Sequence, residues 1–280
     1  MPIPNPPTFF TLALALLATP AAADWPTYAD RDDVCLVVHE LESGREYVSN
    51  PERCDEPRRP YSTFKIANAL LGLETGLLAD ADSVMRYNAA RYPAEDWWPA
   101  GWDRDQPLRR AINMSAVPLF RQLAADIGPV RMQAFLQEID YGNADIGGEA
   151  DAFWLTGDLR ISAVEQVEFL TRLATGRLEV SAESIAAIRD ALAREVAPGV
   201  VLYTKTGSGR IEGDDASGFL GWQVGWVERD ETITVFAFWT EAETYQLMRS
   251  KRQEFLETFI GRARLTHRAP ADPAAQATAN

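Results

Sequence analysis

The pattern of hydrophobic positions changes twice along the chain. Near the N-terminus, the short apolar runs Val34–Val38 and Glu46–Val48 are typical of strands, and Gly44 between them predicts a hairpin turn. From about residue 62 to residue 195 the apolar positions recur at helical spacing. After that, β-branched and aromatic runs bounded by turn residues predict three more strands, at Val200–Thr204, Gly218–Val227 and Thr232–Thr240.

The middle of the chain predicts several helices. The segment Ile66–Glu74 is apolar on most sides, which is typical of a buried helix, and Gly76 suits the residue just past its end. Ser162-Ala163-Val164-Glu165 matches a capping box and predicts that a helix over Ser162–Ala174 begins there. Further helices are predicted at Ala116–Ile127 and Ala182–Arg194, and Phe255, Phe259 and Ile260 mark one face of a last helix.

Strands at both ends of the chain can share a core only by joining one sheet. The sequence therefore predicts an α+β fold (an α/β sandwich) in which the N- and C-terminal segments form a mixed, largely antiparallel sheet flanked by helices, with an inserted helical lobe. An active site is expected in the cleft between the two lobes. We expect these segments: a leader at 1–23, a single domain at 24–268 (sheet lobe 24–60 and 196–268, helical lobe 61–195) and an unstructured tail at 269–280.

The N-terminus resembles a secretory signal peptide. Phe9–Leu17 forms an apolar core, and the small residues Ala21-Ala22-Ala23 suit cleavage before Asp24, although Met1–Thr8 contains no Lys or Arg. We therefore expect export to the periplasm or the medium, with no membrane association after cleavage. An oxidising compartment would allow Cys35 to pair with Cys54, which we expect in a polar loop, whereas two buried free thiols are the alternative.

Composition narrows the function classes. The chain has 27 Lys and Arg against 41 Asp and Glu, a net charge of −14, which argues against nucleic acid or an anionic membrane as a partner. It has only two His, His39 and His267, so a His-rich zinc site is excluded and we expect no metal cofactor. Neither His lies near a nucleophile signature, so any hydrolytic chemistry needs another base. We expect a monomer or a homodimer.

Two short motifs carry candidate chemistry. Ser62-x-x-Lys65 stands where the buried helix is predicted to begin, so the two side chains share a face and the ammonium can reach the hydroxyl. Burial among apolar neighbours would lower the pKa of Lys65 toward that of a usable base. Lys205-Thr206-Gly207 follows a predicted strand and supplies a cation beside a hydroxyl, which suits a carboxylate. Each motif alone also fits an ordinary surface helix or strand end, but together, in this order, they are typical of penicillin-recognising serine enzymes.

Additional motifs resemble one branch of these enzymes. The chain resembles the class D β-lactamases, the oxacillinases, over about residues 30 to 265. The resemblance rests on Pro60-Tyr61-Ser62-Thr63-Phe64-Lys65, Ser115-Ala116-Val117, Tyr141-Gly142-Asn143, Phe153-Trp154-Leu155, Lys205-Thr206-Gly207, Asp158–Ala163 and Gly221–Val227.

The resemblance implies hydrolysis of a β-lactam ring, a reaction on a cyclic amide, with these roles. Ser62 would be acylated, and Lys65 would carry a carbamate derived from CO₂ that acts as general base. Trp154 would donate its indole N–H to that carbamate, Ser115 would relay protons, and Val117 would keep the lysine pocket apolar. The substrate carboxylate would face Lys205, Thr206 and Gly207, and the oxyanion hole would use the N–H groups of Ser62 and Ser208.

The chain departs from the family pattern after Gly207, and it offers two arginines for one of the family's roles. Gly207 is followed by Ser208-Gly209-Arg210 where an aromatic residue is frequent, which would open the edge of the pocket. An arginine on the last helix is expected to bind the substrate carboxylate. Arg252 fits better than Arg249, because Phe255, Phe259 and Ile260 then stand at the expected helical offsets.

Three other functions share these motifs. A penicillin-binding DD-peptidase has the same serine, lysine and Lys-Thr-Gly, but Tyr141-Gly142-Asn143 and Trp154 argue against it. A β-lactam sensor domain would acylate without turnover, but such sensors are joined to transmembrane segments and the sequence shows none. An inactive binding protein is the third, against which the intact Ser62 and Lys65 argue.

Overall fold

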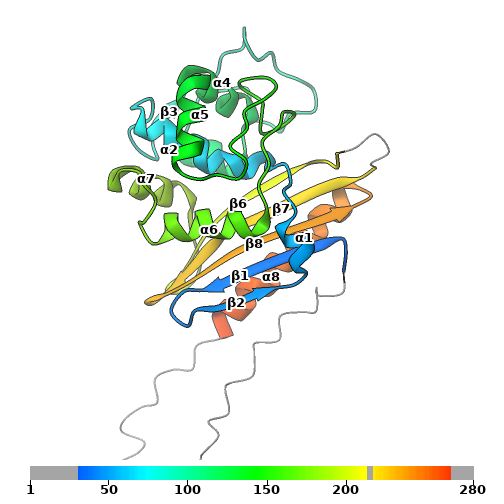
Figure 1. Cartoon of the computed structure of the whole chain (residues 1–280). Helices are drawn as coiled ribbons and strands as arrows, with labels where there is room; N and C mark the ends of the chain where they lie inside the picture. Colours follow the sequence, from blue (N-terminus) through cyan, green and yellow to red (C-terminus); the bar gives the residue numbers. More distant parts are fainter. Residues whose placement is uncertain (1–30, 213–216, 266–280) are drawn as a thin grey trace, which may run out of the picture.

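The computed structural model describes residues 31–212 and 217–265, and its centre is a six-stranded sheet (Figure 1). The strand order is β2-β1-β8-β7-β6-β5, and every neighbouring pair is antiparallel. The strands are β1 (Val34–Glu40), β2 (Arg45–Val48), β5 (Ala193–Ala197), β6 (Val200–Arg210), β7 (Phe219–Arg229) and β8 (Thr232–Ala242). The N-terminal hairpin pairs with the C-terminal β8, so the predicted joining of the two chain ends in one sheet is confirmed.

Helices cover both faces of this sheet, which confirms the predicted α+β class (Figure 1). On one face lies α8 (Tyr245–Leu265). On the other lie the helices of the central segment: α2 (Lys65–Glu74), α3 (Leu108–Met114), α4 (Val117–Ile127), α5 (Pro129–Glu138), α6 (Ala163–Ala174) and α7 (Ala182–Leu192), with the 3₁₀ turn η1 (Tyr61–Phe64) ahead of α2. A short helix, α1 (Pro51–Asp55), follows β2, and a two-stranded ribbon pairs β3 (Val84–Met85) with β4 (Gln106–Pro107).

The strand period of two sends alternate side chains to two separate cores. In β1, Val34, Leu36 and Val38 pack in the cluster that contains Phe255 and Phe259 of α8. Cys35 and Val37, between them, belong to the larger cluster under the central helices. A strand that is apolar on both faces is therefore buried on both faces, as the unbroken run Val34–Val38 requires.

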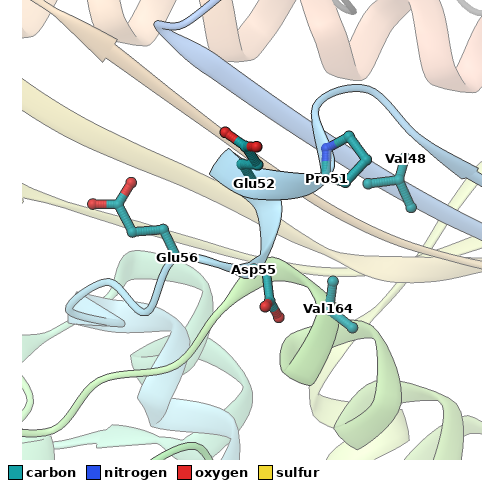
Figure 2. Close-up of a pocket in the computed structure, with 6 residues that line it drawn as sticks. All are labelled: Val48, Pro51, Glu52, Asp55, Glu56 and Val164. Atoms are coloured by element: carbon teal, nitrogen blue, oxygen red, sulfur yellow. The ribbon is translucent and has the colours of Figure 1, made fainter.

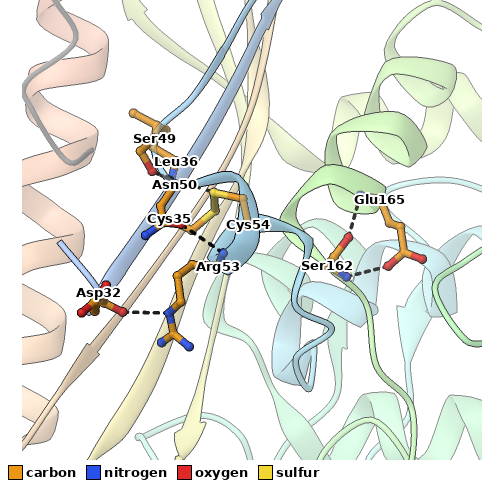
Figure 3. The surroundings of a disulfide bond; sticks show 9 residues. All are labelled: Asp32, Cys35, Leu36, Ser49, Asn50, Arg53, Cys54, Ser162 and Glu165. Carbon is orange, nitrogen blue, oxygen red and sulfur yellow. Dashed lines mark hydrogen bonds between the residues drawn. A yellow bond between two sulfur atoms is a disulfide. The ribbon is translucent and has the colours of Figure 1, made fainter. Parts of the chain in front are cut away.

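The capping box predicted at Ser162 is present. Ser162 Oγ accepts a hydrogen bond from the Glu165 N–H at 3.1 Å, and Glu165 Oε2 accepts one from the Ser162 N–H at 2.7 Å (Figure 3). These reciprocal bonds satisfy two backbone donors at the helix start. α6 packs against β8 and β1, so the cap fixes a helix that covers the centre of the sheet.

Three local predictions were wrong. Cys54 lies in α1 and not in a polar loop. The helix predicted to end at Arg194 ends at Leu192, and the edge strand β5 begins at the next residue. The strand predicted to end at Thr204 continues to Arg210, so Lys205-Thr206-Gly207 lies within β6 and does not follow it. The expected domain boundaries stay predictions, and the expected leader (1–23) and tail (269–280) lie outside the described residues.

A disulfide joins Cys35 of β1 to Cys54 of α1 (Figure 3). The two Cα atoms are 5.3 Å apart and both side chains are fully buried. Next to the disulfide, Ser49 connects the end of β2 to β1, because its Oγ accepts a hydrogen bond from the Leu36 N–H at 2.9 Å. Of the two alternatives left open by the sequence, the structure therefore has the paired cysteines.

We expect the double substitution Cys35→Ala, Cys54→Ala to lower the free energy of unfolding by about 3 kcal/mol, because the bond spans 19 residues and restricts the unfolded chain. Guanidinium denaturation measures the change. A reducing agent should destabilise the unsubstituted protein and leave the double variant unaffected. Mass spectrometry that finds both thiols free in exported protein would contradict the expectation.

Candidate active site

Ser62 and Lys65 lie close together at the start of the most buried helix. Lys65 Nζ donates a hydrogen bond to Ser62 Oγ at 2.6 Å, as the spacing of three residues predicts. One detail of the prediction is corrected: Ser62 does not begin an α-helix but lies in the 3₁₀ turn η1, and α2 begins at Lys65. The pair still meets because residues three apart also share a face of a 3₁₀ turn.

Lys65 is fully buried. Its relative exposure is 0%, and the Phe120 ring centroid lies 5.5 Å from Nζ. Burial, and secondarily the charge of Lys205, hold the pKa of Lys65 well below its ordinary value. The surroundings therefore favour a neutral amine that can accept a proton or react with an electrophile.

Ser115 connects two helices and faces the second lysine. It ends α3 in the left-handed backbone region, with φ 58° and ψ 38°, and α4 begins two residues later at Val117. Its Oγ accepts a hydrogen bond from Lys205 Nζ at 3.0 Å. A non-glycine residue in this region costs about 1–2 kcal/mol, and such strain persists where surrounding contacts require it. Ser115 is thus held in an unfavourable conformation that directs it to Lys205.

The strand β6 brings Lys205, Thr206, Gly207 and Ser208 to an open edge. β5 pairs with β6 only over Val200–Tyr203, so from residue 204 onward no other strand of the described residues lies along this edge, and η1 packs there instead. Gly207 is required by this approach: a Cβ on it would lie 2.6 Å from Pro60 O. The close contact places the Ser208 region of the strand beside the turn that carries Ser62.

One buried and one half-buried cation, Lys205 and Arg252, lie at this strand. Burial, and then the charge of Arg252, lower the pKa of Lys205 to about 7. Burial likewise lowers the pKa of Arg252, whose Nη1 donates to Gly207 O at 3.3 Å and to Trp222 O at 3.4 Å. Arg249 is exposed and lies over the Tyr245 ring, with 6.0 Å between Cζ and the ring centroid. Two cations that disfavour one another would both be stabilised by an anion.

Trp154 is buried and its indole N–H lacks a partner. Its exposure is 0%, its ring centroid lies 5.0 Å from that of Phe64, and Nε1 finds no acceptor among the described residues. A buried unsatisfied donor costs about 1–3 kcal/mol, so it calls for an explanation. Val117, half-buried at the start of α4, packs against the same core.

Sequence reasoning missed the supports of the turn that carries Ser62. Thr63 Oγ1 donates to Pro60 O at 2.9 Å and accepts from Gln166 Nε2, also at 2.9 Å. Both side chains are buried. Gln166 belongs to α6, more than 100 positions away, and no spacing rule could have found it.

Neither of two hollows at the surface coincides with these residues. One, of about 720 Å³, lies beside α1 and is lined by Val48, Pro51, Glu52, Asp55, Glu56 and Val164 (Figure 2). Another, of about 250 Å³, lies between β3 and α4 and includes Met85, Leu119 and Leu123. In residues 31–212 and 217–265, no cluster of His, Cys, Asp or Glu could hold a metal ion. No helix of the described part of the chain is long and apolar enough to cross a membrane.

Known proteins are similar to this chain in both sequence and structure. The family model of the penicillin binding protein transpeptidase domain matches residues 35–260. Beta-lactamase OXA-10 of Pseudomonas aeruginosa is 42% identical over 186 residues, which cover 66% of this chain and 68% of that protein. Regulatory protein BlaR1 of Bacillus licheniformis is 34% identical over 222 residues, which cover 79% of this chain and 35% of that protein.

Among solved structures, the class D β-lactamase FUS-1 (OXA-85) of Fusobacterium nucleatum subsp. polymorphum superimposes with a TM-score of 0.75. The sequences are 33% identical, and the match covers 84% of this chain and 94% of that one. Fold, sequence and the paired Ser62 and Lys65 therefore agree, and the resemblance seen in the motifs is confirmed. The chain belongs to the penicillin-binding transpeptidase-domain family and, within it, to the class D β-lactamases.

Proposed function

We propose that this chain hydrolyses the β-lactam ring of penicillin-type antibiotics through an acyl-enzyme on Ser62. The observation that carries the proposal is the 2.6 Å hydrogen bond between Ser62 Oγ and the fully buried Lys65. A buried amine with a lowered pKa beside a hydroxyl is an activated nucleophile pair. The similarity to named β-lactamases supports the substrate class.

The first half of the reaction is acylation. Ser62 Oγ attacks the lactam carbonyl carbon, its proton leaves toward Lys65, and the carbon–nitrogen bond of the ring breaks. The released nitrogen needs a proton, which Ser115 can deliver because its hydroxyl accepts a hydrogen bond from Lys205. Before the second half, the proton that Lys65 took from Ser62 replaces the one that Ser115 gave to the nitrogen. A water then attacks the ester carbon and gives a proton to Lys65, the bond from that carbon to Ser62 Oγ breaks, and the proton returns to Oγ as the open-ring acid departs.

The negative charge that develops on the carbonyl oxygen needs donors. We assign the oxyanion hole to the backbone N–H groups of Ser62 and Ser208. Across the β6–β7 pairing the Ile211 N–H donates to Gly218 O, so residues 205, 207 and 209 face β7 and the Thr206 backbone groups face the open edge. In an antiparallel strand the backbone groups of residues i and i+2 point to the same side, so the Ser208 N–H faces the same open edge, toward η1.

The two cations suit the carboxylate of a penicillin. Lys205 and Arg252 both lose stabilisation by burial, and a bound carboxylate would restore it. Thr206 adds a hydroxyl at the residue after Lys205, and Gly207 O accepts a hydrogen bond from Arg252 at this strand. Arg252 is the better candidate than Arg249, because it alone of the two reaches Gly207 O.

The base itself is proposed to be a modified lysine. A carbamate formed on Lys65 Nζ by CO₂ would supply the general base for both halves of the reaction. The residues present fit this group: CO₂ adds to a neutral amine, which burial of Lys65 favours, and the unpartnered Trp154 Nε1 is a donor suited to an anion. No metal ion is part of the proposal.

We further propose that residues 1–23 direct the chain to the periplasm or the medium, where it acts as a monomer or homodimer. The buried Cys35–Cys54 disulfide supports an oxidising compartment. A penicillin-binding DD-peptidase or a β-lactam sensor would also be acylated at Ser62. Neither would turn over steadily, so the kinetics of one chromogenic β-lactam separate the hydrolase from both alternatives.

Ser62→Ala should abolish turnover of nitrocefin while the fold is retained, because the nucleophilic oxygen is lost and the fold does not depend on it. Initial rates and circular dichroism measure the two effects. Steady turnover by the unsubstituted protein is expected, and a single stoichiometric burst would favour the sensor or the peptidase. Hydrolysis by Ser62→Ala at the unsubstituted rate would overturn the assignment of the nucleophile.

Trp154→Phe should reduce carbamate occupancy at Lys65, because a buried anion then lacks a donor worth about 1–3 kcal/mol. Turnover should fall at mildly acidic pH after degassing and recover in part with bicarbonate. The carbamate carbon signal under ¹³CO₂ should weaken in parallel. Lys65→Ala should show neither signal nor recovery. Indifference of the unsubstituted protein to bicarbonate, with no carbamate signal, would mean that Lys65 acts as a plain amine.

Binding of a penicillin carboxylate should take up a proton at pH 8. With a pKa of about 7, Lys205 is mostly neutral at that pH, and a bound carboxylate raises this pKa and restores the charge. At pH 5.5 Lys205 is already charged, so little uptake is expected. Calorimetry of benzylpenicillin binding to Ser62→Ala, in two buffers of different ionisation enthalpy, measures the uptake.

The matched control is the double variant Ser62→Ala, Lys205→Arg, because a guanidinium stays charged at both pH values. For that variant, the binding enthalpy measured by calorimetry should be the same in both buffers. Equal proton uptake by Ser62→Ala with and without the Lys205→Arg substitution would assign the titration to another group.

A further inference from the structure

The edge of β6 carries a regular series of backbone groups toward η1. Thr206 O accepts from Lys205 Nζ, and Arg210 O accepts from the Tyr61 hydroxyl. These two carbonyls belong to residues four apart in one strand, so they point to the same side, and the N–H of Ser208, midway between them, points there too. The hydrogen bond from the Tyr61 hydroxyl to Arg210 O therefore holds the same edge of β6, two residues from Ser208.

Tyr61 reaches this edge from the residue next to Ser62. Its φ of 48° is in the left-handed region, which turns the chain between Pro60 and Ser62. Its side chain is buried, with 4% exposure, and spans the gap between η1 and β6. Burial raises the pKa of the Tyr61 hydroxyl, so the group stays protonated and remains a donor.

The strand makes room for this ring by having no side chain at residue 209. A Cβ on Gly209 would overlap the Tyr61 ring. Gly207 is on the same face of β6, and a Cβ on it would contact Pro60 and Thr63, which flank Tyr61 in the sequence. Arg59 also lies near the ring, with its Cζ 6.0 Å from the ring centroid, and its guanidinium is paired with Glu212. The ring is thus enclosed between the turn and the strand.

We propose that Tyr61 is a positioning residue that sets the spacing between the Ser62 and Ser208 N–H groups. The proposal rests on the proposed function, because it takes these two groups as the oxyanion hole. One donor is on the residue next to Tyr61, and the other is two residues from the carbonyl that the Tyr61 hydroxyl binds. A single side chain therefore ties the two halves of the oxyanion hole together, with the ring as spacer and the hydroxyl as anchor.

Tyr61→Phe tests the anchor, because it deletes the hydroxyl and keeps the ring. We expect kcat/KM for nitrocefin to fall about tenfold, less than the loss expected for removing a donor outright, since the donor remains but is misplaced. The isotope-edited infrared band of the acyl carbonyl, trapped with a slowly hydrolysed β-lactam, should move to higher frequency. A merely structural role would not move that band.

Tyr87→Phe is the matched control. The Tyr87 hydroxyl also donates to a backbone carbonyl, that of Tyr92, at 2.6 Å. Both variants should lower Tm by a similar amount, about 2–4 °C, but Tyr87→Phe should keep kcat/KM and the carbonyl band. An unchanged band and rate in Tyr61→Phe, in a protein whose unsubstituted form turns over, would overturn the proposal. Absence of turnover in the unsubstituted protein would instead overturn the proposed function.

Gly209→Ala tests the spacer independently of the hydroxyl. The added methyl displaces the ring, so kcat/KM should fall at least tenfold. Combined with Tyr61→Ala, which removes the ring, the same methyl should cause no further loss. Losses that multiply in the double variant would show that residue 209 and Tyr61 act separately, and the proposal would fail even if Tyr61→Phe could not be purified in folded form.

Discussion

The rest of the site depends on one constraint: Lys65 must be buried without a charged partner. Moving an unpaired ammonium into an apolar interior is so costly that the group gives up its proton instead. The surrounding chain is arranged to impose this. α2 is buried at every residue from Lys65 to Leu73, and the Phe120 ring lies above the amine. The second lysine adds a like charge nearby, which lowers the pKa of Lys65 further. The neutral state of Lys65 therefore depends on the packing of the whole core around it.

The sheet explains how residues far apart in sequence reach this lysine. β6 is buried along one face and open along one edge, because its partner β5 begins only at Ala193, opposite Tyr203. Beyond that point Lys205 of β6 donates a hydrogen bond to Ser115, and Arg210 O of β6 accepts one from Tyr61 of η1. A longer β5 would pair with these groups and close the site. The short edge strand is thus a functional feature, and the rare side-chain-free positions Gly207 and Gly209 let the turn approach the strand at van der Waals distance.

Sequence patterns predicted what depends on local periodicity and missed what depends on distant contacts. Ser62 and Lys65 could be paired because a spacing of three brings side chains together in an α-helix and in a 3₁₀ turn alike. The helical offsets of Phe255 and Phe259 correctly predicted that these residues face β8, whereas the role assigned to Arg252 from the same offsets stays a prediction. β5 was missed because its exposed residues Ala193–Glu195 lack an apolar alternation. The support of Thr63 by Gln166 and the contact of Tyr61 with Arg210 depend on tertiary packing, which no local pattern encodes.

The features that suit the surroundings of Ser62 and Lys65 to chemistry reduce the stability of the folded state. Two buried lysines, an unsatisfied indole N–H and the left-handed backbones of Tyr61 and Ser115 all raise the free energy of the folded state. Such a set persists only if the frame around it is rigid. Two continuous cores on opposite faces of the sheet provide that frame, and the disulfide fastens α1, the segment that leads into η1. Because relaxation of the turn would let water reach Lys65 and restore its proton, the rigidity of the frame is itself part of the chemistry.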